Sequence, residues 1–279
     1  MTEHDQTDEH GGTDAIANVE SGHPQDHAPC DGRPLDDPRL DDPRLDDSYL
    51  RVVPGTETGG TVVLVGVTHD HPASRERARR VVEGVTPAVV ALELSPLVIP
   101  LYRQYAGSGD GRTASEYDGG EMAAALAASG DGRVVGIDAP NWAYARRLVE
   151  ALRSRETDRE AAVSAIRDTI SVSRHAVACA VGAAIRTVTP WSPTVETPAS
   201  HDSSTADPPA AQAAHEARQL SRSRALLGAL EPPPGQELVD ELREASMSSR
   251  IDALRTEGAV VAVVGHAHLE PIYERLAAE

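Results

Sequence analysis

The sequence predicts an α/β fold, with a largely parallel sheet flanked by helices and an active-site crevice at the carboxyl ends of the strands. From residue 61 onward, short runs of valine and other aliphatic residues alternate with segments whose apolar residues recur at helical spacing. This alternation is typical of β-α-β units. With 279 residues, 40% of them hydrophobic, the chain is long and apolar enough to bury the core of one domain.

The order of the expected elements follows from these patterns. Each expected strand is a run of β-branched or other aliphatic side chains, and each expected helix repeats apolar residues every three or four positions. The strands are expected at residues 61–65, 88–93, 133–138 and 259–264. The helices are expected at residues 72–84, 120–129, 140–154, 236–256 and from residue 271.

Two segments are expected to lie outside this packed core. Residues 1–50 hold 14 acidic residues against 3 arginines and repeat Leu-Asp-Asp-Pro-Arg, a composition that buries too little apolar surface to offset its ordering entropy. They are predicted to form an acidic disordered leader before an α/β domain at residues 51–279. A flexible insertion rich in proline, serine and threonine is expected at about 187–209. The leader also carries four histidines, which nothing in the sequence preorganises for a metal: His4, His10, His23 and His27.

The charge of the chain excludes some classes of partner. The formal net charge is -18, and all 26 basic residues are arginine, so binding to nucleic acid is not expected. An acidic surface without lysine is typical of proteins that work in concentrated salt, and we interpret the chain as halophilic. Cys30 and Cys179 show no paired spacing, which argues against a disulfide scaffold. With no secretory signal and no apolar stretch longer than residues 175–185, we expect a cytoplasmic protein without a membrane span.

Polar residues follow each expected strand. They are the segment Gly66-Val67-Thr68-His69, the carboxylates Glu93 and Asp138, and the segment Gly265-His266-Ala267-His268. In a parallel sheet these ends lie along one edge, where ligands bind. Two imidazoles and a carboxylate are a usual ligand set for a catalytic divalent metal, which keeps one position open for water. The sequence therefore predicts two histidine motifs and two carboxylates in one site.

Each of these residues also has an alternative interpretation. Glu93 is equally a strand-end carboxylate that caps a helix or pairs with an arginine, and Asp138 precedes ordinary helix-start residues. Glu121 stands at a helix start, where the helix dipole favours a carboxylate whatever its function. Gly66 and Gly265, three residues before each histidine, let the backbone or a bound group approach closely, so they are candidates for cofactor binding.

An ordered series of short motifs links these strand ends. The series is Gly66-x-x-His69, Glu93-Leu94, Gly120-Glu121-Met122, Ile137-Asp138, Arg243-Glu244 ahead of Met247, and Gly265-x-x-His268. In order and approximate spacing it resembles the TraB/PrgY/GumN family, in its halophilic archaeal form, over residues 61–152 and 238–275. One departure is that Ala139 and Pro140 stand where family members have an arginine after the aspartate. Arg147, at the place of a later family arginine, is the candidate substitute.

The resemblance implies a metal-dependent activity. Similar members include bacterial proteins that shut down a peptide pheromone and animal membrane-anchored peptidases that depend on a divalent metal. By this resemblance His69, His268 and Glu93 hold a divalent metal, manganese, cobalt or zinc, and His268 is favoured over His266. His71 and His266 each lie two residues from one of these histidines in the sequence, and we expect them to support the metal ligands or to replace them.

Catalytic roles are likewise implied for four residues: Glu93, Glu121, Asp138 and Arg243. Arg243 would hold a substrate carboxylate or a polarised carbonyl. We therefore expect a metal-dependent hydrolase of the peptidase type, acting on a peptide or other small-molecule substrate. The alternative is a non-catalytic regulatory protein of the pheromone-shutdown type that binds a peptide, a metal or haem.

Overall fold

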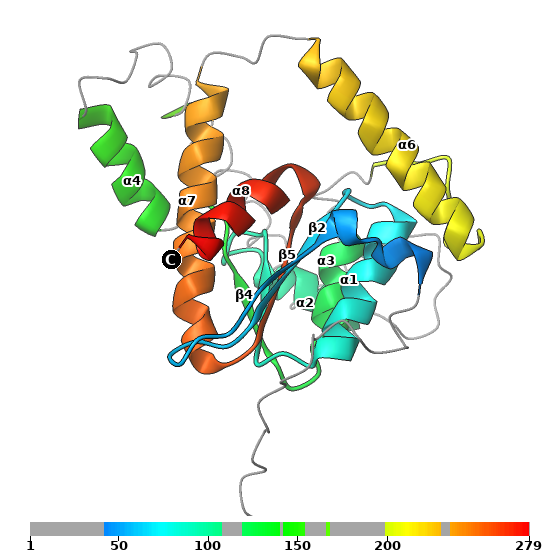
Figure 1. Cartoon of the computed structure of the whole chain (residues 1–279), viewed down its shortest axis with the longest axis horizontal. Coiled ribbons are helices and arrows are strands. Elements are labelled where there is room, and N and C mark those ends of the chain that lie inside the picture. The colour runs from blue at the N-terminus through cyan, green and yellow to red at the C-terminus, as the bar shows by residue number, and fades with distance from the viewer. Residues whose placement is uncertain are drawn as a thin grey trace, which may run out of the picture. The chain divides into compact units, whose positions relative to one another are not determined.

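A computed structural model describes residues 42–107, 119–139, 142–153, 166–167, 199–229 and 235–278. All of them belong to one compact unit, Pro34–Glu279. They contain a five-stranded sheet in the order β1-β2-β5-β3-β4 (Figure 1). The strands are β1 (Leu50–Val53), β2 (Val62–Val67), β3 (Val89–Leu92), β4 (Arg133–Gly136) and β5 (Val260–Gly265). Only the β1–β2 pair is antiparallel among these four pairs, which confirms the predicted α/β fold with a largely parallel sheet and flanking helices.

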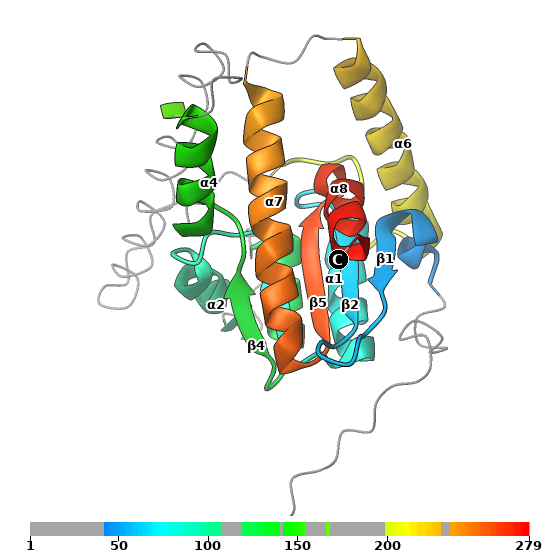
Figure 2. The ribbon, with the colours of Figure 1, turned by 60° about the vertical axis from the view of Figure 1, so that its left-hand side comes forward.

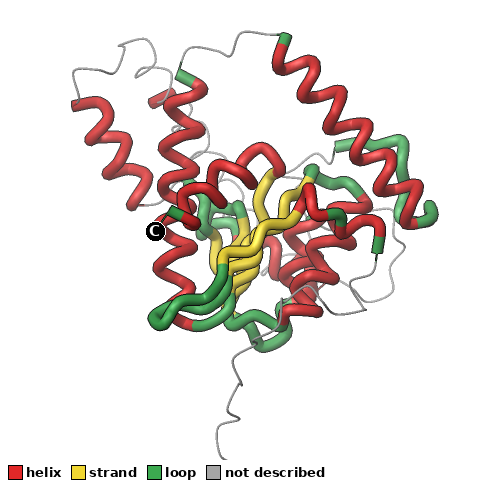
Figure 3. The backbone as a smooth tube through the Cα atoms, in the orientation of Figure 1, coloured by secondary structure: helices red, strands yellow, loops and turns green. Residues whose placement is uncertain are grey.

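Helices surround the sheet in the described part of the chain (Figure 3). The α-helices are α1 (Pro72–Val85), α2 (Ile99–Gly107), α3 (Gly120–Ala128), α4 (Trp142–Arg153), α6 (Pro209–Gly228), α7 (Gln236–Leu254) and α8 (His266–Ala277). Short 3-10 turns are η2 (Pro43–Leu45), η3 (Asp47–Tyr49) and η4 (Arg255–Glu257). None of the described helices is long and apolar enough to cross a membrane.

Alternate residues of each strand face two separate cores. Val63 and Val65 of β2 pack with α1, α2 and α3 on one face, whereas Val62 and Leu64 pack with α7 and α8 on the other. Figure 2 shows α7 and α8 in front of the strands and α1 behind them. A strand buried on both faces needs an unbroken apolar run, which is why the strand positions were readable from the sequence.

The folded part begins earlier than the expected boundary at residue 51. Asp42 accepts a hydrogen bond from the Arg44 amide and caps η2, with Pro43 in the first turn. Leu45 and Tyr49 are buried, at 8% and 5% exposure. Residues 42–45, which include the last three residues of the second Leu-Asp-Asp-Pro-Arg copy, thus form a capped turn that packs on the domain. Aspartate and proline are good helix-start residues as well as residues of disordered chains.

Among the described strands and α-helices, β1, α2 and α6 were not expected from the sequence. In addition, α8 begins at His266, so that Pro271 lies inside it and not at its start. Of the expected insertion at 187–209, residues 187–198 lie outside the described residues. Residues 199–208 form a loop that leads into α6, and the Ala199 amide donates to Asp70 at 2.8 Å.

Candidate active site

The sheet register aligns the ends of four strands. β5 is the central strand and lies between β2 and β3, with Val67 opposite Gly265 and Leu92 opposite Val263. On the outer side of β3, β4 pairs Gly136 with Leu92. His69, Glu93, Asp138 and His268 all follow these paired ends within three residues, so the parallel topology brings them to one edge.

His69 is held by Glu121, which lies at the start of α3. The Nδ1 atom of His69 lies 2.9 Å from Glu121 Oε1, and the Asp70 amide donates to Glu121 Oε2 at 2.9 Å. Glu121 is only 3% exposed, while the His69 side chain is 67% exposed. The hydrogen bond to Glu121 raises the pKa of His69 to about 9, although burial acts in the opposite direction. Glu121 therefore orients the imidazole through its Nδ1 atom, and the rest of the ring stays accessible to solvent.

Gly120 makes this approach possible. Its φ of 57° lies in the left-handed region, and a Cβ there would lie 2.6 Å from Asp70 Oδ1. Asp70 itself has a φ of 58°, a conformation that aspartate tolerates better than most residues. The two unusual backbone positions let the turn after β2 and the start of α3 meet closely enough for Glu121 to reach His69.

His268 has an equivalent carboxylate partner. Its Nδ1 atom lies 2.9 Å from Glu244 Oε1 on α7, and both side chains are 12% exposed. On the other side of the ring, Nε2 lies 3.6 Å from Glu93 Oε1. A carboxylate on one ring nitrogen is the usual way in which proteins fix the orientation of a metal-binding histidine. Both imidazoles of the site therefore have the same support.

Arg243 on α7 joins the carboxylates of the strand ends. Its guanidinium binds both oxygens of Asp138, at 3.0 and 2.7 Å, and donates to Glu93 Oε1 at 2.7 Å. Its Nη1 atom lies 3.3 Å from His268 Nε2. Burial alone would lower the pKa of Arg243, but the hydrogen bond to Asp138 and the charges of Asp138 and Glu93 raise it. We call these four residues, Glu93, Asp138, Arg243 and His268, the strand-edge cluster.

Gly265 leaves a gap at the centre of the site. A Cβ at this position would lie 3.4 Å from Glu93 Oε2, 3.9 Å from His268 Cδ2 and 4.0 Å from His69 Nε2. Three side chains that follow three different strands therefore surround one point beside Gly265, where a Cβ would make only ordinary contacts. The Gly265 amide also donates to Glu93 Oε2 at 2.6 Å, which fixes the carboxylate beside both imidazoles.

The donor types around Gly265 suit a divalent metal. Each imidazole has its Nδ1 atom against a glutamate, which directs Nε2 away from that glutamate. The Nε2 atom of His268 lies 3.3 Å from Arg243 Nη1, so a metal bound there would have to displace this contact. In the part of the chain that the structure describes, however, no group of three or more His, Cys, Asp or Glu side chains stands in metal-binding geometry. The guanidinium of Arg243 occupies one oxygen of Glu93 instead, so a metal ligated by Glu93 would have to compete with it.

Other predicted residues lie elsewhere. Gly66 is inside β2, where a Cβ would lie 2.9 Å from Leu269 Cδ2, so it permits α8 to pack on the sheet. Arg147 donates to Ser249 between α4 and α7 and is not among the partners of the strand-edge cluster. His266 faces Tyr49 and Arg224, away from the partners of His268.

His71 supports the loop that carries His69. It caps α1 by accepting from the Ala73 amide at 3.1 Å, and its Nε2 atom lies 3.0 Å from His215 Nδ1. Burial lowers the pKa of His71 to about 4, so the ring is neutral and, with Nδ1 accepting, Nε2 is the donor to His215. His201 donates to the His69 carbonyl at 2.8 Å. The loop after β2 is thus held from α6 and from the 199–208 loop.

Glu244 and His201 are the site residues that the sequence did not single out. Glu244 stood in a quoted motif, and the rule that a metal-binding histidine needs a carboxylate partner would have selected it. His201 belongs to a segment whose composition indicates only a loop, and no local signal pointed to its contact with His69.

Comparisons of the chain with protein-family models, with curated proteins and with solved structures found no match.

Proposed function

We propose that this protein is a metal-dependent hydrolase that acts on a peptide or a similar acyl substrate. One observation carries the proposal: His69 and His268, about 200 residues apart, each have Nδ1 on a glutamate and approach the same point at Gly265 beside Glu93. Paired imidazoles with carboxylate support next to a third carboxylate are the ligand arrangement of catalytic divalent metals. The motif series that resembles the TraB/PrgY/GumN family supports the same activity.

In this proposal the ligands are His69, His268 and Glu93. A bound divalent ion would supply a water of lowered pKa and polarise the substrate carbonyl. Glu121 and Glu244 fix the rings through Nδ1, and neither glutamate has to touch the substrate. Because both oxygens of Glu121 already bind His69 and Asp70, its part is orientation.

Arg243 has a separate role in this proposal, which is to bind the substrate. Asp138 binds the guanidinium through both of its oxygens and so fixes its plane, while the Arg243 side chain remains 25% exposed. A guanidinium held in this way is suited to a substrate carboxylate or to the oxygen that gains charge during acyl transfer. Asp138 is then the residue that positions Arg243.

A second candidate rests on the same arginine. With Arg243 against Glu93 and Asp138, the strand-edge cluster is neutralised to a large extent without a metal. That arrangement favours a non-catalytic regulatory protein that binds a peptide or another small ligand and does not turn it over.

Metal content and cleavage, measured together, separate the two candidates. The protein is purified in molar potassium chloride, loaded with manganese, cobalt or zinc, dialysed, and assayed for bound metal and for cleavage of a peptide library. We expect one metal per chain in the parent, loss of metal in His69→Ala and His268→Ala, and near-parent content in the control His266→Ala. Glu93→Gln keeps the shape of the side chain and should lose most of the metal.

Two results count against the hydrolase. Parent-like metal content in both histidine variants would exclude the proposed ligands. Stoichiometric metal without cleavage of any peptide, with a peptide retained, would support the binding protein.

A further inference from the structure

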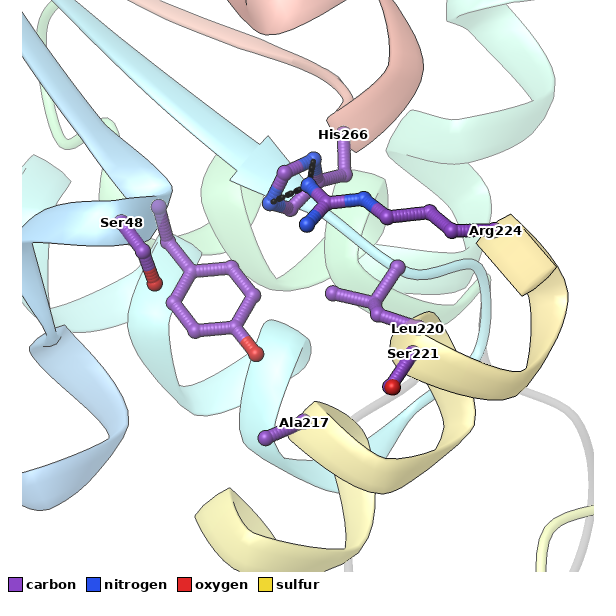
Figure 4. Close-up of a pocket in the computed structure, with 7 residues that line it drawn as sticks. Ser48, Ala217, Leu220, Ser221, Arg224 and His266 are labelled. Carbon is purple, nitrogen blue, oxygen red and sulfur yellow. Dashed lines mark hydrogen bonds between the residues drawn. The ribbon is translucent and has the colours of Figure 1, made fainter. Parts of the chain in front are cut away.

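A pocket lies between η3, α6 and the first residue of α8, next to the proposed active site along the chain (Figure 4). Its volume is about 220 Å³, and it is lined by residues from three elements: Ser48, Tyr49, Ala217, Leu220, Ser221, Arg224 and His266. His266 directly follows Gly265 in the chain, so the pocket and the proposed active site are neighbours along β5 and α8. None of the seven lining residues belongs to the site described above.

One cation faces this pocket. Arg224, in the last turns of α6, reaches across to the ring of His266, with its Nη2 atom 3.3 Å from Nδ1 and 3.4 Å from Nε2 (Figure 4). Within the described ranges no carboxylate pairs with it. Since no carboxylate of the described residues neutralises its charge, the Arg224 guanidinium is able to bind an anion in the pocket.

Tyr49 supplies a hydrogen-bond donor without a partner. Its side chain is 5% exposed and lines the pocket, and its hydroxyl binds no other group in the part of the chain that the structure describes. Burial raises the pKa of Tyr49 to about 12, so the hydroxyl stays protonated and can donate. The guanidinium of Arg77 stacks on the other face of the ring, 3.7 Å from its centroid, and holds the ring in place.

The rest of the lining is partly polar and partly apolar. Ser48 and Ser221 carry hydroxyls that donate or accept, while Leu220 and Ala217 offer an aliphatic wall on α6 (Figure 4). The first turn of α8 also begins here, and Gly265 gives it no side-chain cap. Backbone amides at such a helix start favour a negative group.

We propose that this pocket binds a small organic carboxylate, with the acid group between Arg224 and the Tyr49 hydroxyl and an apolar body against Leu220. A single arginine with neutral donors matches a single negative charge, whereas a phosphate with about two charges calls for more cations than the lining offers. A cavity volume of about 220 Å³ suits a small organic acid. The carboxylate belongs either to a free acid or to the last residue of a peptide.

Calorimetric titration tests the proposal on the full chain without added metal, so that its outcome does not depend on the hydrolase activity. N-acetyl-leucine is compared with N-acetyl-leucinamide, which has the same body and no charge. We expect the acid to bind at least tenfold more tightly than the amide. Equal binding of the two compounds, or no binding of the acid, would overturn the proposal.

Variants on one helix locate the binding. Arg224→Gln should weaken binding of the acid at least tenfold, and Tyr49→Phe should weaken it several-fold. Arg222→Gln is the matched control, because it removes the same charge from an exposed position of α6 outside the pocket. Equal weakening by Arg222→Gln and Arg224→Gln would mean general attraction of anions and would contradict a site.

A last comparison identifies the source of the carboxylate. A short peptide ending in leucine is titrated beside its C-terminal amide and beside N-acetyl-leucine. Tighter binding of the peptide with a free carboxyl group identifies a peptide terminus as the ligand. Tighter binding of the small acid identifies a free metabolite-sized acid.

Discussion

Two arginine–carboxylate clusters in this molecule differ in how far they are removed from water. In the first, which we call the buried arginine cluster, Arg77 of α1 pairs with Glu216 of α6, both side chains are 0% exposed, and the Ser74 hydroxyl also donates to Glu216. In the strand-edge cluster, the Arg243 side chain is 25% exposed, and Glu93 and Asp138 are 6% and 12% exposed.

The partners of the two arginines show why one cluster is structural and the other is a candidate site. Arg77 donates its remaining hydrogens to the Gly66 and Arg44 carbonyls, so the buried arginine cluster joins β2, η2, α1 and α6. A buried charge with all its hydrogen bonds made has nothing left for a ligand. Arg243 instead shares its carboxylates with an imidazole and an amide at the edge of the sheet, where a ligand can replace one contact.

Breaking the buried arginine cluster should have the largest effect on stability. Glu216→Gln leaves the Arg77 guanidinium buried without a counter-charge, and the loss of one partner of a buried pair costs about 3–5 kcal/mol. Chemical unfolding in molar potassium chloride measures the free energy. Glu274→Gln, an exposed carboxylate on α8, is the control and should change stability by less than about 0.5 kcal/mol. Equal effects of the two substitutions would show that α6 is not held by this pair.

Disrupting the strand-edge cluster should lower the free energy of unfolding by a smaller amount, and a bound metal should restore part of it. Arg243→Gln is expected to lower the unfolding free energy by about 1–3 kcal/mol, because Glu93 and Asp138 then face each other with partial access to water. A divalent metal should recover part of this loss, since it restores a positive charge to the carboxylates. Glu216→Gln should show no such recovery, and recovery in both variants would contradict the distinction between the clusters.

The smallest effect is expected at the surface, where Glu76 of α1 pairs with Arg79 and Arg80. The hydrogen bond from Arg79 lowers the pKa of Glu76 from 4.5 to about 2, against the effect of burial. A carboxylate with a lowered folded-state pKa stabilises the fold above pH 4.5, and this contribution disappears as the pH falls towards 2.

Glu76→Gln should therefore lower the free energy of unfolding by no more than about 1 kcal/mol at pH 7, because solvent screens a pair whose side chains are 23% and 37% exposed. The difference from the parent should vanish near pH 2, as urea unfolding at several pH values would reveal. Glu57→Gln, at an exposed position for which no ion pair appears among the described residues, is the matched control. A difference that persists at pH 2 would mean that Glu76 acts through something other than its charge.

The sequence predicted the parts of the fold that depend on apolar periodicity. The parallel strands are buried on both faces, so their valine runs were readable, and helices such as α1 and α7 were placed to within a few residues. Among the α6 side chains that the structure describes, those buried against the domain are Gln212 and Glu216, at 2% and 0% exposure. A helix that is attached through polar side chains leaves no hydrophobic stripe to detect, and for that reason α6 was missed.

The same reasoning applies to the candidate site. Residues at the ends of strands, such as His69 and Glu93, were selected because parallel topology places them together. The partner that orients His268 is Glu244 on α7, and the contact between His201 and the His69 carbonyl comes from a loop. These contacts depend on how helices and loops are placed on the sheet, and sequence spacing does not encode that placement directly.

X-ray absorption at the zinc edge of the zinc-loaded protein shows whether His69 and His268 bind one metal. We expect a coordination shell with two imidazoles at about 2.0–2.1 Å and a carboxylate oxygen at about 2.0–2.2 Å. The zinc signal itself should disappear in His69→Ala and in His268→Ala, because these variants lose the metal, while His266→Ala should keep the shell with both imidazoles. A shell of oxygen atoms alone, or loss of an imidazole only in His266→Ala, would contradict a metal bound by His69 and His268.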